Sequence, residues 1–237
     1  MDSKNVICFD IGGTFVKYGV LDYEGNILTK DSFKSNADNG QEILDNMCEV
    51  VKKYIKLYKI EGISISSPGF VDVENGIITA GTIIDGFIGL NMKKYFGDKF
   101  GLPIAIDNDA NCATIAEHKL GNGKGCKNLV CVTIGTGIGG GIIINNDIYH
   151  GSKFMAGEFG FMFINGTKRE NPDHYIYSNY ASTRALVEKA NKRLHEEVDG
   201  KEIFERAKSG DIDCKEILDE FFDDLSLGIY NLAYILN

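Results

Sequence analysis

Residues 5–12 read NVICFDIG, and residues 128–135 read NLVCVTIG. The two stretches lie 128 − 5 = 123 positions apart and share asparagine, cysteine, isoleucine and glycine at four of eight positions. Each reads as a buried strand that runs into a glycine-rich turn and then into a second apolar strand. This repeat predicts an α/β protein of two related lobes with a cleft between them, residues 1–122 and residues 123–237.

Helices are expected between and after these strands. Apolar residues at steps of three and four are typical of amphipathic helices, and they predict helices over residues 41–59, 91–100, 109–121, 182–197, 203–208 and 214–237. Further strands are predicted at residues 27–28, 62–67 and 102–107. The last helix has a strongly apolar face, and no strand follows it. We therefore expect the second lobe to be incomplete and the chain to be cut short at its C-terminus.

The composition is that of a compact globular protein. Of its 237 residues, 43% are hydrophobic and 25% are charged, which excludes disorder as the main state. The net charge of 25 − 34 = −9 and the lack of a basic cluster argue against a nucleic-acid surface. No apolar run approaches the roughly 20 residues of a membrane span, and no signal peptide precedes the first strand, so a cytoplasmic protein is expected. The six cysteines form no CxxC pair, which indicates free thiols.

The first candidate site is the turn at residues 10–14, DIGGT. The backbone N–H groups of Gly12 and Gly13 can approach phosphate oxygens closely, and Thr14 adds a hydroxyl donor. The Asp10 carboxylate can hold the Mg²⁺ that accompanies a nucleotide. The same residues also suit a plain β-hairpin turn, because Gly-Gly is a common hairpin dipeptide.

The second candidate site is the turn at residues 135–141, GTGIGGG. Its glycines have the spacing of a dinucleotide-binding fingerprint, but that fingerprint must open a helix. The residues that follow continue as a strand, which disfavours a dinucleotide-dependent oxidoreductase. A phosphate-binding hairpin is the preferred interpretation, with two such turns closing on one polyphosphate.

Two further candidate sites contain carboxylates. Asp107, Asn108 and Asp109 follow an apolar strand, where α/β sheets place ligands, and a carboxylate there can take a proton from a substrate hydroxyl. Capping of the following helix is the alternative, and one residue can cap while another catalyses. Glu158, in the stretch AGEFG, can accept hydrogen bonds from hydroxyls or can lie in a solvated surface turn.

Five motifs in this order resemble the ROK family (repressors, open reading frames and sugar kinases). They are residues 10–14 (DIGGT), 67–69 (SPG), 108–109 (ND), 135–141 (GTGIGGG) and 156–160 (AGEFG). The resemblance runs from about residue 6 to residue 237. It implies the actin-like, hexokinase-like ATPase fold of two RNase-H-like lobes. It also implies a kinase that moves the γ-phosphoryl group of ATP to a sugar hydroxyl, usually at C6.

The resemblance also implies roles for single residues. Asp109 would be the catalytic base, and Asn108 and Glu158 would bind sugar hydroxyls. Gly69 would form part of the sugar-site wall, and Asp10 would hold Mg²⁺ through water. The nucleotide phosphates would be held by the backbone of Gly12, Gly13, Thr14, Gly135, Thr136, Gly137, Gly139 and Gly140.

The sequence departs from the family pattern in three places. Many members carry a zinc loop, CxCGxxGCxE, after the sequence GExGH, but here Phe161 replaces the histidine and residues 163–180 contain no cysteine, so no zinc is expected. The glutamate of that loop falls near Ser178, which removes one expected sugar contact. The family's adenosine-binding glycines after the last helix are also missing, so this chain is expected to bind sugar yet hold ATP poorly.

The resemblance leaves the sugar open. Zinc-free members with a GEFGY-like sequence include β-glucoside kinase-like and N-acetylmannosamine kinase-like proteins, and glucose is the third option. The expected partners are a hexose and ATP with Mg²⁺, without nucleic acid or membrane, and family members often form homodimers. A sugar-responsive repressor is disfavoured because no helix-turn-helix precedes Val6. A non-catalytic sugar-binding or regulatory member is the other alternative, and the presence of Asp109 counts against it.

Overall fold

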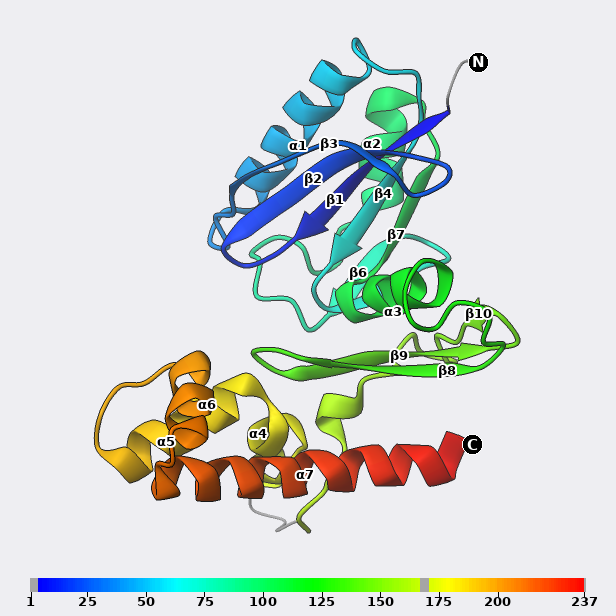
Figure 1. Ribbon diagram of the computed structural model, residues 1–237. Helices are drawn as coiled ribbons and strands as arrows, with labels where there is room; N and C mark the ends of the chain where they lie inside the picture. Colours follow the sequence, from blue (N-terminus) through cyan, green and yellow to red (C-terminus); the bar gives the residue numbers. More distant parts are fainter. Residues whose placement is uncertain (1–3, 167–170, 237) are drawn as a thin grey trace. The chain divides into compact units, whose positions relative to one another are not determined.

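The computed structural model describes residues 4–166 and 171–236 and divides into two compact units. Unit 1 consists of Met1–Gly125 together with His150–Met155, and unit 2 consists of Cys126–Tyr149 together with Ala156–Asn237. The colours of Figure 1 follow the chain through both units. The short segment His150–Met155 therefore belongs to unit 1, although its neighbours in the sequence on both sides belong to unit 2.

A five-stranded sheet forms the centre of unit 1 (Figure 1). β1 pairs antiparallel with β2 and parallel with β4, and β7 pairs parallel with β4. Because side chains alternate across a strand, Ile7, Phe9 and Ile11 face the core and are at most 2% exposed. Cys8 and Asp10 therefore point to the opposite face. In spatial order the strands are β3 (Ile27–Lys34), β2 (Phe15–Asp22), β1 (Asn5–Ile11), β4 (Ile60–Ser67) and β7 (Ile104–Asn108).

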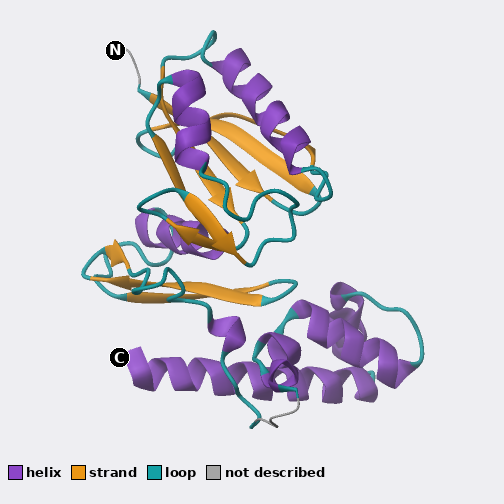
Figure 2. Ribbon diagram, turned by 180° about the vertical axis from the view of Figure 1, so that it is seen from behind, coloured by secondary structure: helices purple, strands orange, loops and turns teal. Residues whose placement is uncertain are grey.

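Helices cover both faces of this sheet. α1 (Gly40–Tyr54) and α2 (Met92–Phe100) lie on one face, in front of the strands in Figure 2, and bury their apolar residues against it. α3 (Asp109–Lys119) lies on the other face, beside the side chains that point away from this core. A small hairpin of β5 (Phe70–Asp72) and β6 (Ile77–Ala80) follows β4.

Unit 2 combines a three-stranded antiparallel sheet with a cluster of helices. One apolar core joins α5, α6 and α7. A second core joins β8 and β9 with Phe159, Tyr177 and Leu232. The elements are β8 (Leu129–Ile134), β9 (Ile138–Ile144), β10 (Asp147–Ile148), η1 (Phe159–Phe161), η2 (Pro172–Tyr175), α4 (Ser178–Ala181), α5 (Thr183–Leu194), α6 (Gly200–Lys208) and α7 (Ile212–Leu236).

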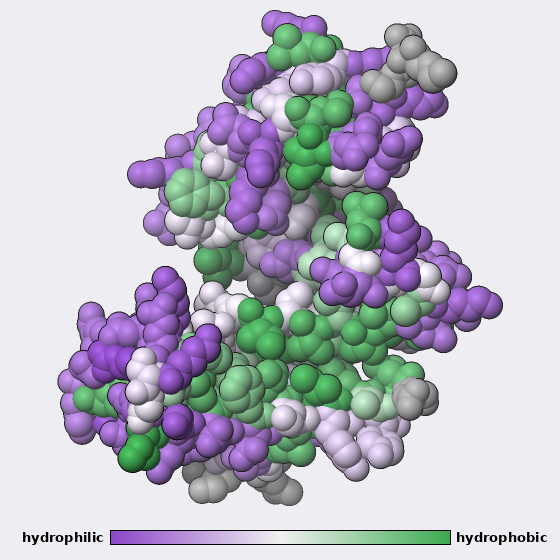
Figure 3. All heavy atoms as spheres, in the orientation of Figure 1, coloured by the Kyte–Doolittle hydropathy of each residue, from purple (hydrophilic) through white to green (hydrophobic). Residues whose placement is uncertain are grey.

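An apolar groove of about 730 Å³ runs along unit 2, between β8, β9 and the last turns of α7. Figure 3 shows hydrophobic side chains gathered over these elements. Near the end of α7, Tyr234 and Ile235 are 76% and 72% exposed. The predicted apolar face of the last helix is thus buried at residues such as Ile217 and Leu232 and exposed at Ile235.

Several elements differ from their predicted bounds, and three cases have a clear physical reason. α1 ends at Tyr54 and does not continue to residue 59. The apolar spacing that extended the prediction came from Ile55, which is exposed, and from Tyr58, which packs against the core from the turn after the helix. β3 continues to Lys34, since an exposed edge strand has little apolar alternation to reveal it. The β5–β6 hairpin was not predicted, because its strands are only three and four residues long.

We expect Gly228 in α7 to be essential for packing in unit 2. A Cβ atom at this position would lie 2.2 Å from Cζ of Tyr177, whose side chain is 0% exposed. The Tyr177 hydroxyl donates a hydrogen bond to the carbonyl of Leu225 at 2.6 Å, so the ring has little room to move. Gly228→Ala should lower the free energy of unfolding by about 1–3 kcal/mol, measured by urea denaturation.

The control for this prediction is Gly97→Ala in α2, where nothing lies within 4 Å of the new Cβ atom. We expect that variant to raise the free energy of unfolding by about 0.5–1 kcal/mol, because alanine is the better helix former. Equal changes in the two variants would contradict the packing role of Gly228.

Candidate active site

Asn108 joins β7 to α3. Its Oδ1 accepts hydrogen bonds from the backbone N–H groups of Ala110 and Asn111 at 2.8 and 3.2 Å, so it is the N-cap of α3. Its Nδ2 donates to the carbonyl of Gly69 at 3.0 Å. Gly69 has a φ of +99°, and a Cβ atom there would lie 2.4 Å from the carbonyl oxygen of Ala80. Asn108 therefore holds the start of α3 beside a turn that only glycine fits.

The Asp107 carboxylate is paired on both oxygens. Its Oδ1 accepts hydrogen bonds from the backbone N–H of Asn108 at 2.7 Å and from Nδ2 of Asn111 at 3.0 Å. Its Oδ2 lies 2.7 Å from Nε2 of His150, and the hydrogen bond between them raises the pKa of His150 above its usual value. Both oxygens of Asp107 are thus already engaged by the protein.

Asp109 is the first residue of α3 and is exposed. Its Oδ1 accepts a hydrogen bond from the backbone N–H of Ala110 at 2.8 Å. Partial removal from water by the surrounding chain raises the pKa of this carboxyl group; the N–H of Ala110 lowers it, and the negative charge of Asp10 raises it further. An accessible carboxylate with raised proton affinity is suited to act as a general base.

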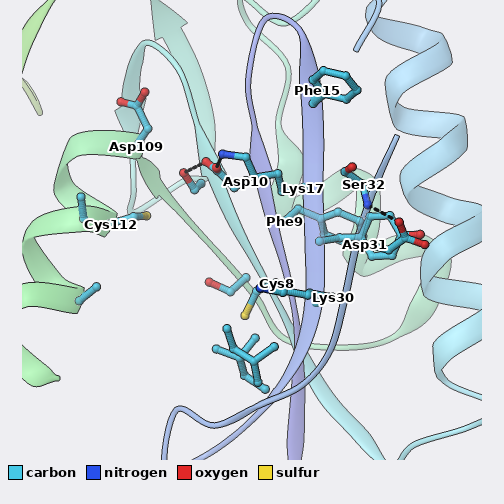
Figure 4. A pocket seen from close by; sticks show the side chains of 18 residues that line it. Cys8, Phe9, Asp10, Phe15, Lys17, Lys30, Asp31, Ser32, Asp109 and Cys112 are labelled. Carbon is cyan, nitrogen blue, oxygen red and sulfur yellow. Dashed lines mark hydrogen bonds and ion pairs between the residues drawn. The ribbon is translucent and has the colours of Figure 1, made fainter. Parts of the chain in front are cut away.

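Asp10 shares a hollow with Asp109. Oγ of Ser66 donates to Oδ1 of Asp10 at 2.9 Å, and Nζ of Lys17 lies 3.4 Å from Oδ2. The hollow has a volume of about 950 Å³ and is lined by α3 and by strands β1 to β4. Figure 4 shows Asp10 beside Lys17, with Asp109 on the neighbouring helix. Two carboxylates therefore face one space from different elements of unit 1.

Residues 12–14 form the connection of a β-hairpin. The backbone N–H of Gly12 donates to the carbonyl of Phe15 at 3.0 Å. Gly13 is exposed at the tip, and a Cβ atom there would lie 3.2 Å from Cδ1 of Ile83. The backbone is thus that of a plain hairpin turn, and phosphate binding by its exposed tip stays a prediction.

The second predicted turn, residues 135–141, is a turn only at residues 135–137, which connect β8 to β9 and are exposed, because β9 already begins at Ile138. The carbonyl of Gly135 accepts a hydrogen bond from the backbone N–H of Thr183 at 2.9 Å, which ties the turn to the start of α5. Gly140 lies inside β9 and is buried, and a Cβ atom there would lie 2.5 Å from the ring of Phe159. Packing therefore explains the glycine at position 140, and the exposed part of the predicted phosphate turn is residues 135–137.

Glu158 lies between glycines that packing requires. Gly157 has a φ of +90°, and a Cβ atom on Gly160 would lie 2.3 Å from Oγ of Ser178. That Oγ accepts a hydrogen bond from the backbone N–H of Ile138 at 2.9 Å, so the Ser178 hydroxyl holds the start of β9. The special backbone path predicted around Glu158 is confirmed. Its contact with a sugar stays a prediction, because Glu158 belongs to unit 2 and Asp109 to unit 1.

Sequence reasoning did not identify three residues that hold the acidic groups of unit 1: Ser66, Lys17 and His150. Two of these pairs are far apart in the chain, with a separation of 56 positions for Ser66 and Asp10 and of 43 for His150 and Asp107, and no local spacing marks them. Lys17 is instead the cross-strand neighbour of Asp10 in the β1–β2 hairpin. The sequence contains one hint that His150 contributes to the site, because this residue lies in the segment that leads to Glu158.

The described residues also bear on metals, membranes and thiols. Within residues 4–166 and 171–236, no group of three or more histidine, cysteine, aspartate or glutamate side chains is arranged to hold a metal ion. In the same ranges, no helix combines the length and apolar character needed to cross a membrane. All six cysteines are free, as predicted. Burial raises the pKa of Cys8 to about 11 and that of Cys112 to about 12, so these thiols stay protonated near neutral pH.

Comparison with known proteins agrees with the pattern of motifs. The model of the ROK family matches residues 6–237. A β-glucoside kinase from Listeria monocytogenes is 36% identical over 236 residues, which cover 98% of this chain and 79% of that protein.

Solved structures show the same fold. A Listeria monocytogenes protein described as a candidate N-acetylmannosamine kinase aligns with a TM-score of 0.91 at 35% identity, covering 98% of this chain and 80% of that one. A ROK family glucokinase from Streptomyces griseus, in complex with glucose and AMPPNP, aligns with a TM-score of 0.82 at 29% identity, with coverage of 98% and 80%. These likenesses confirm the α/β, actin-like ATPase fold that the sequence predicts.

Removal of the Asn108 cap is expected to destabilise the junction between β7 and α3. Asn108→Ala loses two accepted hydrogen bonds and the one donated to Gly69, so we expect the free energy of unfolding to fall by about 1–2 kcal/mol in urea denaturation. Asn108→Ser keeps a good capping oxygen and loses only the bond to Gly69, so its loss should be smaller. An alanine variant as stable as the wild type would show that the cap contributes nothing.

Proposed function

The chain belongs to the ROK family, and from this premise we propose that it is an ATP-dependent kinase that transfers the γ-phosphoryl group of ATP to a hexose hydroxyl, at C6. The observation that carries the proposal is the Asp109 carboxylate, which is exposed, has a raised pKa and shares its hollow with Asp10. Phosphoryl transfer needs positioning, charge stabilisation and one well-placed base. The similar β-glucoside kinase and glucokinase support the same reaction class.

Asp109 acts on the acceptor. As a carboxylate it accepts a hydrogen bond from the sugar hydroxyl and takes its proton while the hydroxyl oxygen attacks phosphorus. Asn108 binds neighbouring hydroxyls, and its side chain is already oriented by the cap and by Gly69. Gly69, whose carbonyl accepts the hydrogen bond from Asn108, forms the adjoining wall of the sugar site.

Asp10 suits the Mg²⁺ that accompanies ATP. Its side chain is 50% exposed and each oxygen has one partner, Ser66 or Lys17, so lone pairs remain for water molecules of a hydrated cation. Carboxylate oxygens and water are the ligands that Mg²⁺ prefers, so the residues present fit the ion. When bound, Mg²⁺ neutralises charge on the β- and γ-phosphates. The exposed backbone of residues 12–14 and 135–137 is proposed to hold the phosphates.

Glu158 binds hydroxyls near the anomeric end of the sugar, and the substrate is glucose, a β-glucoside or N-acetylmannosamine. The sugar site works without zinc in this proposal. Phe161, which is 56% exposed, stands where zinc-containing members have a histidine, and Ser178 is engaged by the backbone of β9.

Calorimetric titration with glucose, N-acetylmannosamine and cellobiose tests the sugar site. We expect saturable binding of one sugar, with a dissociation constant below about 1 mM, the upper range of ordinary substrate affinities. A folded chain that binds none of the three would refute the sugar site. Saturable binding of both a sugar and ATP with no ATP-dependent turnover would instead favour the non-catalytic or regulatory alternative.

Asp109→Asn is expected to abolish phosphoryl transfer while the sugar dissociation constant stays within about tenfold, or 1.4 kcal/mol. Asparagine keeps an oxygen for the N–H of Ala110 but cannot take a proton, so binding and chemistry separate. Initial rates and calorimetry measure the two effects. The matched control is Asp31→Asn, which changes a carboxyl group on β3 in the same hollow and should leave the rate unchanged. Wild-type turnover in Asp109→Asn would remove this residue from the base role.

A further inference from the structure

A histidine from late in the chain contacts β7, the strand that ends directly before the proposed base. His150 begins the segment His150–Met155, which belongs to unit 1 while the sequence on either side belongs to unit 2. Its Nε2 lies 2.7 Å from Oδ2 of Asp107, and the side chains are 20% and 14% exposed. The ring of Phe154 lies edge-on to the imidazole, with centroids 6.4 Å apart. The segment is therefore anchored on unit 1 by a mostly buried polar contact.

This contact ends a continuous chain of hydrogen bonds. The other oxygen of Asp107 accepts from the backbone N–H of Asn108 and from Nδ2 of Asn111, and Asn108 in turn caps α3. The residues that these hydrogen bonds connect lie on both sides of Asp109 in the sequence. A change at His150 therefore reaches the strand end and the first helical turn that together orient the base.

Loss of the imidazole would leave Oδ2 of Asp107 mostly buried and without this partner. A buried carboxylate without partners on both oxygens is strongly unfavourable. The side chain would then turn toward water and release the hydrogen bonds of its other oxygen to Asn108 and Asn111. A shift of about 1 Å in a reacting group costs on the order of a hundredfold in rate.

The same segment leads to the second proposed sugar ligand. Glu158 follows His150 by 158 − 150 = 8 positions. Gly157 is buried and Phe159 belongs to an apolar core of unit 2. The chain between His150 and Gly157 thus starts from a fixed point on unit 1 and ends at a fixed point on unit 2.

We propose that His150 is a positioning residue for phosphoryl transfer: by pairing with Asp107, it sets the orientation of Asp109 and anchors on unit 1 the segment that leads to Glu158. The inference rests on the proposed function, because it takes Asp109 as the base. His150 itself touches neither the sugar nor the nucleotide in this proposal. Its effect is on the rate of transfer at bound substrate.

Steady-state kinetics of His150→Ala and His150→Gln test the proposal. We expect the alanine variant to lose roughly 10- to 100-fold in kcat, with the KM for sugar changed less than about threefold. The glutamine amide nitrogen reaches about as far as Nε2 of histidine and can donate to Asp107, so kcat should return to within about threefold of wild type. His195→Asn is the control, since His195 is exposed at the end of α5 with a φ of +56°, which asparagine tolerates.

Thermal unfolding checks that each variant is folded. If His150→Ala does not fold, His150→Asn takes its place, because its amide is one methylene shorter and does not reach Asp107. An unchanged kcat in the shortened variant, a loss confined to KM, or equal kcat losses in the shortened and glutamine variants would each overturn the positioning role. Asp109→Asn in the same assay separates the two hypotheses. Turnover retained there removes Asp109 from the base role on which this inference rests, whereas turnover lost there but normal in His150→Ala overturns only the inference on His150.

Discussion

A mostly buried carboxylate at the end of a parallel strand has to be paired on both oxygens, and the junction of β7 with α3 is organised around this requirement. Asp107 receives the N–H of Asn108, the amide of Asn111 and the imidazole of His150. With those bonds in place, Asn108 is free to cap the helix, and Asp109 is the acidic residue that faces outward. Three adjacent polar residues of similar character thus have three different tasks, which are set by their hydrogen bonds.

The fold could be predicted where apolar pattern and turn chemistry agree. The strand pairs β1–β2 and β8–β9 join through glycine-rich turns as predicted, and β9 follows its turn where a dinucleotide-binding protein would have a helix. Predictions of element bounds failed where residues are exposed to solvent, because exposed positions need no regular apolar spacing. The edge strand β3 has no fully buried residue, and the exposed Ile55 extends the apolar spacing of α1 beyond its end. That the two units arose by duplication stays a prediction.

The candidate site could be predicted only in part, because motifs record local chemistry. Asp10, Gly69, Asn108 and Asp109 all lie in unit 1, with Asn108 bonded to Gly69 and Asp10 facing the same hollow as Asp109. Ser66 and His150, which bind Asp10 and Asp107, come from distant positions in the sequence, so a motif of adjacent residues does not contain them. The glycines of the unit 2 motif also have different reasons. Gly140 is required because the ring of Phe159 packs against it, whereas phosphate binding by residues 135–137 stays a prediction.

The segment His150–Met155 belongs to unit 1 although unit 2 flanks it in the sequence, and this also affects how the protein folds during synthesis. During synthesis the ribosome makes β8, β9 and β10 before residue 150, so the pair between Asp107 and His150 cannot form while only the first 125 residues exist. Domains of larger proteins generally fold one after another as they are made. Here the first unit gains its last polar partner only after the sheet of the second has been made. The two units are therefore not independent modules, and an N-terminal fragment ending at Gly125 would contain Asp107 without the histidine that pairs with it.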